Sequence, residues 1–483
     1  MSLSNALSNA MSGIAAVTRG TEVVSSNLAN ALTPGFARRE LQLSARPYAA
    51  GGVHVDGVTR TVRTSVVAQG RVASADTART QIIATFHKTM ADSIGVPGET
   101  GALTTLLADF DAALTAAAAQ PQSEINLSRV LATAQTLARS YGTLGAQVQD
   151  ARTEADRAIA SDVQALNDGL AQVAELNRQI SVQQSAGDDA TALQDSRRQL
   201  IDSLSEIVPI QELPRDGGRV ALFTAGGAIL LDGVTPAAIG FNAAGPLAAG
   251  MTVEGSSVGR LSFNGQELSA GQMVMFSGGR LAANFQIRDV DAPAAQSRLD
   301  AAARDLVERF SDPDVDATRG NGPGLFTDAG ASLDPAKEAG LSQRLAVNAV
   351  VDIAQGGSLW RLRDGLGASA PGPVGQTALL DRLRGALAEQ RISGSSGMSA
   401  TPRSAATMAA DVTSWAATAR LGAESALAGA TARSDSYDAM IRQDGVDSDQ
   451  EMETLLGLER AYTANAKVLS AVDDMIQTIL RLS

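Results

Sequence analysis

The beginning of the chain carries an unbroken heptad pattern of apolar and small residues, which predicts a long helix. Apolar positions alternate at spacings of four and three residues from Leu3 until Thr33-Pro34-Gly35, where proline and glycine end the pattern. The residues between them are mostly Ser, Asn, Thr and Gly and carry little charge, so we expect other protein to surround this helix. The seam consists of Leu3, Leu7, Ile14, Val17, Val24 and Leu28.

The end of the chain repeats the same pattern and predicts a second long helix. Asn465 is a polar residue within this seam, where it can fix the register of a partner at a cost in stability. Chain ends usually fray, so sustained seams there indicate that the two ends pair with each other or with copies of the chain. An ordinary helical bundle is the alternative. The second seam consists of Leu455, Leu458, Tyr462, Asn465, Leu469, Val472, Ile476 and Ile479.

The middle of the chain changes from helix to strand and back. Helical patterns cover residues 122–182, 193–208, 293–310 and 403–441, whereas glycine is dense between residues 214 and 280. Short alternating runs at 219–223 and 272–276 predict strands joined by tight turns. The fold class expected is mainly α with an inserted β domain. It is a nested rod in which the terminal helices pair like a coiled coil, with a long helical middle layer and a small outer β domain.

The order of these segments predicts units built from both halves of the chain. Residues 1–35 with 447–483 form a terminal helical inner domain, and residues 214–280 form the β-rich outer domain. Residues 36–213, 281–311 and 403–446 together form the helical rod domain. Residues 312–402 are mixed and rich in loops, and the sequence assigns them to none of these units.

Composition argues against catalysis and against nucleic-acid binding. The 483 residues have a formal net charge of −13, which repels phosphate backbones. Cysteine is absent, which excludes disulfides and thiolate zinc sites, and the two histidines are His54 and His87. We expect no cofactor and no metal. An enzyme would have to work with carboxylates alone, so we expect none.

Two short motifs have the spacing of a catalytic or a metal-binding site but lack residues that such a site requires. Residues 255–259 (GSSVG) match the string of a serine nucleophile elbow, but both histidines precede them in the chain. Asp312, Asp314 and Asp316 open like a calcium loop, which then lacks glycine at its sixth position and glutamate at its twelfth. A turn and a solvated acidic loop are the favoured interpretations.

No secretory or membrane segment is expected from the sequence. The first charged side chain is Arg19, so the chain lacks a basic leader region, and no apolar run approaches the ~18 residues of a membrane span. The sequence therefore predicts either a cytoplasmic protein or one exported without a cleaved signal.

Both ends of the chain resemble the bacterial flagellar axial proteins. Residues 27–30 (NLAN) with 33–36 (TPGF) resemble the N-terminal signature of these proteins, and residues 460–469 (RAYTANAKVL) resemble their shared C-terminal helix. Hook, rod and junction proteins all carry such ends. Residues 193–200 (LQDSRRQL) and 279–300 are similar to segments of the FlgK-type hook-associated proteins in particular.

The resemblance implies a structural subunit at the junction between hook and filament. Copies would assemble as a ring through the terminal helices, next to the hook protein and the second junction protein. The chain would leave the cytoplasm through the flagellar type III apparatus, and an export chaperone would hold its C-terminal helix beforehand. Alternatives are another axial protein, either the hook subunit or the second junction protein, and a coiled-coil scaffold unrelated to flagella.

The resemblance also singles out structural residues. Asp195 and Arg197 are expected to hold neighbouring helices together, although a local pair between Asp195 and Arg198 is an alternative. The turn after the first helix is expected to connect inner and outer layers, with Phe36 as a packing anchor. This turn is Thr33-Pro34-Gly35-Phe36, for which a simple helix stop is the alternative, and Asn27 and Asn30 complete the structural motif.

Overall fold

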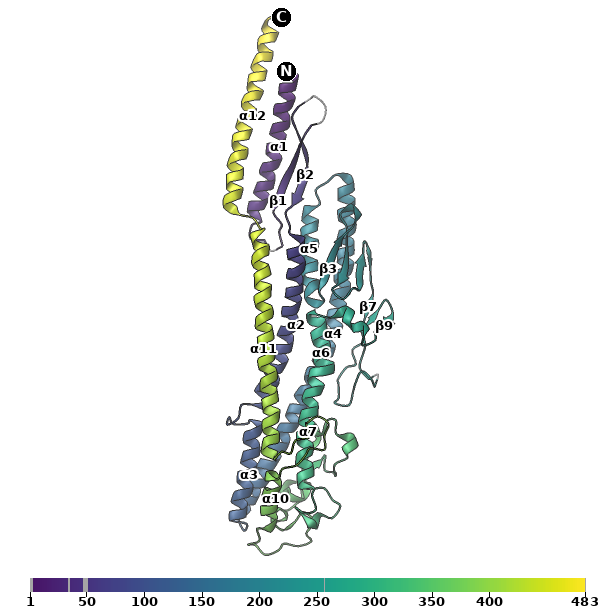
Figure 1. Cartoon of the computed structure of the whole chain (residues 1–483), viewed down its shortest axis with the longest axis vertical. Coiled ribbons are helices and arrows are strands. Elements are labelled where there is room, and N and C mark those ends of the chain that lie inside the picture. The colour runs from purple at the N-terminus through teal and green to yellow at the C-terminus, as the bar shows by residue number, and fades with distance from the viewer. Residues whose placement is uncertain (1–2, 34, 47–50, 256, 483) are drawn as a thin grey trace.

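Long helices from both halves of the sequence form a narrow rod. The computed structural model describes residues 3–33, 35–46, 51–255 and 257–482, and Pro34 lies outside them. In the rod, α2 (Thr64–Ile94) packs along α11 (Ala405–Gln443). Figure 1 shows both ends of the chain at one end of the molecule, beyond this rod. The other helices are α1 (Leu3–Ala29), α3 (Leu103–Ala119), α4 (Glu124–Ala186), α5 (Thr191–Ile207), α6 (Gly279–Gln286), α7 (Ala292–Phe310), α8 (Leu341–Arg344), α9 (Arg361–Asp364), α10 (Ala378–Ala388) and α12 (Ser448–Leu482).

The strands form small antiparallel sheets beside the helices. The hairpin of β1 (Arg39–Ala45) and β2 (Val53–Arg60) lies against α1, far from the other sheets. The inserted β segment holds a four-stranded and a three-stranded sheet, so the predicted fold class is confirmed. The remaining strands are β3 (Ile210–Pro214), β4 (Val220–Thr224), β5 (Ile229–Asp232), β6 (Thr235–Pro236), β7 (Ile239–Gly240), β8 (Ser262–Phe263), β9 (Gln266–Glu267), β10 (Phe326–Asp328) and β11 (Leu345–Val347).

The longest helix, α4, passes through two separate hydrophobic cores. The Ser123 hydroxyl caps its start by accepting a hydrogen bond from the Asn126 N–H, and Gly187 ends it in a left-handed conformation at φ 82°. Its first half shares one core with residues of α2, α3, α7 and α11, and its second half shares the other core with α5 and the β segment. The apolar stripe that the sequence predicts along its second half, from Ile159 to Ile180, is buried.

One predicted strand is wrong. Gln272–Phe276 forms a short 3₁₀ helix, because the N–H groups of Gln272 and Met273 both donate to the Ser269 carbonyl and so close a turn. The Gln272 side chain also accepts hydrogen bonds from Ser269, which stabilises that turn. Alternating apolar residues predicted a strand here, but only Phe276 is buried. The predicted strand at 219–223 is confirmed as β4.

Residues 312–402 belong to the first core. Phe326 of β10 packs against Phe110 of α3 and Phe310 of α7, with ring centres 5.6 and 5.3 Å away. The carboxylate of Asp300 in α7 accepts hydrogen bonds from the N–H groups of Gly340 and Ser342, at 2.7 and 2.8 Å. Burial nevertheless raises the pKa of Asp300. This segment, which the sequence left unassigned, therefore closes the far end of the rod.

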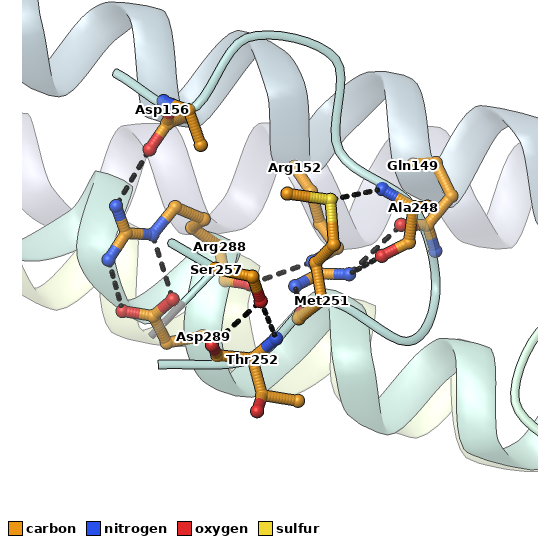
Figure 2. Close-up of polar contacts among 10 residues, drawn as sticks. Gln149, Arg152, Asp156, Ala248, Met251, Thr252, Ser257, Arg288 and Asp289 are labelled. Carbon is orange, nitrogen blue, oxygen red and sulfur yellow. Dashed lines mark hydrogen bonds and ion pairs between the residues drawn. The ribbon is translucent and has the colours of Figure 1, made fainter. Parts of the chain in front are cut away.

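A cluster of buried charges joins α4 to the β segment and to the turn between α6 and α7, as Figure 2 shows. Arg288 lies in a π-helical turn, Ile287–Asp291, and pairs with Asp156 at 2.7 Å and Asp289 at 2.8 Å. The Arg152 guanidinium donates to the carbonyls of Arg288, Ala248 and, at 2.6 Å, Met251. Burial lowers the pKa of Arg152. The cluster thereby fixes the long loop of the β segment to the rod.

Candidate assembly interface

The two terminal helices pair with each other at the end of the molecule. Figure 1 shows α1 and α12 side by side, running in opposite directions, with the β1–β2 hairpin next to α1. Among the described residues, neither hydrophobic core of the rod includes a side chain of α12. The terminal helices and the hairpin are thus a bundle that lies outside the rod cores, and we call it the terminal bundle.

Glycines on α1 lie opposite larger side chains on α12. A Cβ atom on Gly13 would come within 3.0 Å of the Asn465 side chain, and one on Gly20 would come 3.1 Å from Leu458. The small residues therefore allow the two helices to approach closely. On the same antiparallel register Leu3 lies level with Met475, so the last turns of α12 extend past the described part of α1.

A buried polar group closes the inner end of this bundle. The Glu451 carboxylate, only 1% exposed, accepts hydrogen bonds from Arg38 Nε at 2.7 Å and from Asn27 Nδ2 at 3.2 Å. The Asn27 amide also bonds both the N–H and the C=O of Arg39, at 2.9 Å each. One buried asparagine therefore joins α1 to the start of β1 and to α12, and its neighbour Glu451 is paired with a charge, as a buried carboxylate requires.

The turn after α1 rests on α5. The N–H of Phe36 donates to the Thr33 carbonyl, and the Asn30 side chain donates to the Ser26 carbonyl. Gly35 has φ +77°, and a Cβ there would lie 2.6 Å from the Gln199 side chain of α5. Phe36 is half-buried, with the Arg39 guanidinium 4.9 Å above its ring.

Asp195 and Arg197 both contact elements outside α5. Arg39 and Arg60 are register partners on β1 and β2, and Asp195 pairs with both, at 3.2 and 2.7 Å. Arg197 donates to the Asn177 side chain of α4 at 2.7 Å and to the Gly218 carbonyl at 2.8 Å. Burial lowers the pKa of Arg197. Arg198 lies 3.7 Å from Asp202, one turn along the same helix.

Replacing Asp195 by asparagine is expected to destabilise the contact between hairpin and α5 by about 2 kcal/mol, because two facing arginines lose the anion between them. Chemical unfolding of the Asp195→Asn variant, followed by circular dichroism, measures this effect. Asp56→Asn is the matched control, because Asp56 lies on the same hairpin but is exposed. Equal unfolding midpoints for the two variants would contradict the expectation.

The predicted seam residues range from buried to exposed. Val17, Val24 and Val472 are buried, whereas Leu3, Leu7, Ile14, Leu455, Leu458, Asn465 and Leu469 are half-buried. Tyr462, Ile476, Ile479 and Leu28 remain exposed, and Ile479 has 54% of its surface in solvent. Further apolar residues on α12 that the sequence did not assign to the seam are also exposed: Met452, Leu456, Val468, Met475 and Leu480. A single chain therefore leaves a large apolar surface uncovered on these helices.

Sequence reasoning missed three of the residues that shape this bundle. Gly13, Gly20 and Asn27 follow one another at intervals of seven residues. Glu451, Leu458 and Asn465 do the same. This spacing was the available signal. It was overlooked because glycine and glutamate are not apolar and a hydrophobic seam excludes them.

The described residues hold no group of three or more potential metal ligands. No helix among them has both the length and the apolar composition needed to cross a membrane. The Ser257 hydroxyl within the GSSVG string bonds to the backbone of Thr252, as Figure 2 shows, which is the geometry of a local turn.

Three protein-family models match separate parts of the chain. The flagellar hook-associated protein FlgK helical domain matches residues 88–322, which include α3 to α7 and the β segment. The flagellar basal body rod FlgEFG protein C-terminal model matches residues 438–482, and the flagella basal body rod protein model matches residues 7–36. The last two matches coincide with the two helices of the terminal bundle.

Individual proteins show the same likeness. Flagellar hook-associated protein 1 of Escherichia coli (strain K12) is 26% identical over 242 residues, which are 48% of this chain and 44% of that protein. The protein of the same name from Salmonella typhimurium is 27% identical over 246 residues, 48% of this chain and 43% of that protein. This chain thus matches less than half the length of either relative.

A solved structure is also similar. The flagellar hook junction protein FlgK from Burkholderia pseudomallei aligns with a TM-score of 0.45 and 20% identity, over 54% of this chain and 46% of that one. The family matches at the helical domain and at both ends of the chain agree with one another. Together, the family models and the named relatives support a FlgK-type flagellar hook-associated protein.

Proposed function

We propose that this chain is a structural subunit of the bacterial flagellum that joins hook to filament. The family is structural and not enzymatic. The observation that carries the proposal is the exposed apolar surface of the terminal bundle, which lies outside the rod cores. A surface of this kind needs a partner, and a ring of copies supplies one to every subunit through the same heterologous contact.

In this proposal each region of the chain has its own layer. Residues 1–35 with 447–483 form the inner wall of the ring, and the rod of residues 36–213, 281–311 and 403–446 surrounds it. The β segment at 214–280 lies outermost. The hook protein and the second hook–filament junction protein are the axial neighbours of the ring.

The proposal includes a route to the site of assembly. The chain is exported by the flagellar type III apparatus, and a chaperone covers the C-terminal helix in the cytoplasm beforehand. The exposed apolar residues of α12 support this step, because an uncovered surface of this kind promotes premature association.

Deleting the gene tests the proposed function. Cells without the protein are expected to keep their hooks, to lose their filaments and to release unassembled flagellin into the medium. Antibody labelling of isolated hook–filament structures from the parent strain should place the protein at the junction. Loss of the hook itself, or labelling along the hook, would instead assign the chain to another axial position.

A further inference from the structure

A groove runs along one side of the rod, between α2 and α4. Its volume is about 360 Å³, and it is open to solvent. Among the described residues, those that line it come from α2, α4, α6 and the π-helical turn, and none comes from α11. Its apolar lining includes Ile82, Phe86 and Met90 of α2, Ala151 and Ala155 of α4, and Ile287 of the π-helical turn.

Among the described residues, one acceptor at the rim of the groove has no hydrogen-bond donor. Gln147 of α4 lines the groove, and its side-chain Oε1 is shielded from solvent without a hydrogen-bond partner. A shielded acceptor of this kind costs free energy until a donor reaches it. The groove therefore offers an apolar floor and one unused acceptor.

On α11 an exposed stripe points away from the rod. Its residues recur at spacings of four and three, as in a helix seam, yet all of them are in solvent. None is charged, although the chain as a whole is acidic. Leu421, which is 65% exposed, is the one large side chain among them. The stripe consists of Ser414, Thr418, Leu421, Ser425, Ala428 and Ala432.

The stripe and the groove lie at the same height along the rod. They face different sides of it. Arg420 pairs with Asp92 at 3.0 Å, which places Leu421 level with the Met90 end of the groove. The buried side of α11, which includes Ala416, is about half a helical turn away from Leu421. The stripe thus faces outward on α11, whereas the groove lies across α2 from it.

We propose that the stripe of one copy, with Leu421 at its centre, packs into the groove of the next copy. The inference rests on the proposed function, since a ring brings two different faces of neighbouring subunits together at equal height. Two copies of an acidic chain repel each other, and an uncharged stripe brings no second negative charge to the carboxylate of Glu154, which lines the groove. Thr418 and Ser425, one turn on either side of Leu421, add exposed hydroxyl groups to the stripe.

The contact is too small to hold two free chains together. A stable interface buries about 800 Å² on each partner, far more than one leucine and its small neighbours can cover. The chain is therefore monomeric in solution at this surface. The contact forms once the terminal bundles hold neighbouring copies side by side, which raises their effective concentration.

Disulfide trapping tests the contact, because the chain contains no cysteine of its own. Ser425→Cys with Thr85→Cys places one thiol on the stripe and one on the rim of the groove. Mild oxidation of hook–filament structures isolated from cells that carry this variant should give a ladder of linked copies on a denaturing gel. Ser425→Cys with Thr115→Cys is the control, because Thr115 is equally exposed on α3, and it should give no ladder.

A charge substitution gives a second readout. Leu421→Glu should leave the melting temperature unchanged, because the side chain is exposed, and should lower incorporation into the junction at least tenfold. Ile125→Glu is the matched control, since Ile125 is 81% exposed on α4 and outside both surfaces.

The possible outcomes separate the two proposals. If the wild-type chain is absent from the junction, the proposed function fails. If the variants are present but Ser425→Cys with Thr85→Cys links no copies, or links the chain to a different polypeptide, the stripe-in-groove contact is overturned. Normal incorporation of Leu421→Glu would overturn it as well.

Discussion

A chain from which residues 448–483 are deleted is expected to fold its rod normally and to be absent from the hook–filament junction. The structure places no described residue of α12 in either hydrophobic core, and its main partner is α1. The deletion thus removes the surface proposed for assembly and leaves the rod packing intact. Thermal unfolding by circular dichroism should show an unchanged main transition, while antibody labelling finds no protein in isolated hook–filament structures.

A shorter deletion distinguishes the contact between α1 and α12 from the role of the α12 turns that extend beyond α1. Removing residues 477–483 leaves the contacts of α12 with Gly13, Gly20 and Asn27 in place. It deletes only the turns that extend past α1, including the exposed Ile479 and Leu480. This variant should also melt normally and should incorporate poorly. If instead the longer deletion lowers the melting temperature of the whole chain, the terminal helices are part of an ordinary bundle core.

Replacing Arg288 by methionine is expected to destabilise the rod by about 3–5 kcal/mol, because it leaves a buried carboxylate without its counter-charge. Asp156 is fully buried, and the Arg288 guanidinium is its cationic partner at 2.7 Å. Ala244 N–H also donates to this carboxylate at 2.7 Å, which is too little to balance a full charge. Denaturant unfolding, followed by circular dichroism, should show the midpoint at a clearly lower concentration.

Two variants test that the buried charge is the cause. Asp156→Asn combined with Arg288→Met should recover most of the loss, because the fully buried carboxylate is then neutral and Asp289, the other partner of Arg288, is partly exposed to solvent. Arg178→Met is the control, since Arg178 pairs with Glu175 on the same helix, but both are exposed. It should leave the midpoint unchanged. A midpoint for Arg288→Met equal to that of the control would refute the explanation.

The sequence predicted the helices wherever the apolar spacing alone decides the structure. The heptads at both ends and the stripe of α4 from Ile159 to Ile180 need no information about distant residues, and all three are helical. The strand predicted at residues 272–276 was wrong because hydrogen bonds to Ser269 determine that turn, and alternation does not reveal them. Local patterns thus identify most helices but not the turns set by single side chains.

The polar contacts of the terminal bundle could not be predicted from the sequence, because their partners lie far apart in the chain. Glu451 is buried only because Arg38 and Asn27 meet it, and both lie more than 400 residues earlier in the chain. Asp195 holds two arginines that face each other only after β1 and β2 have paired in register. Such contacts depend on the tertiary arrangement, which no local spacing encodes.

The pairing of α1 with α12 also sets the order in which the molecule can fold. Asn27 and Glu451 are 424 residues apart, so their contact closes almost the whole chain into one loop. Contacts of such long range form slowly, whereas the packing within the rod, such as that of α3 on α4, joins residues close in sequence. The surface that meets the neighbouring subunits is therefore the last to be completed, after the rod that carries it has formed.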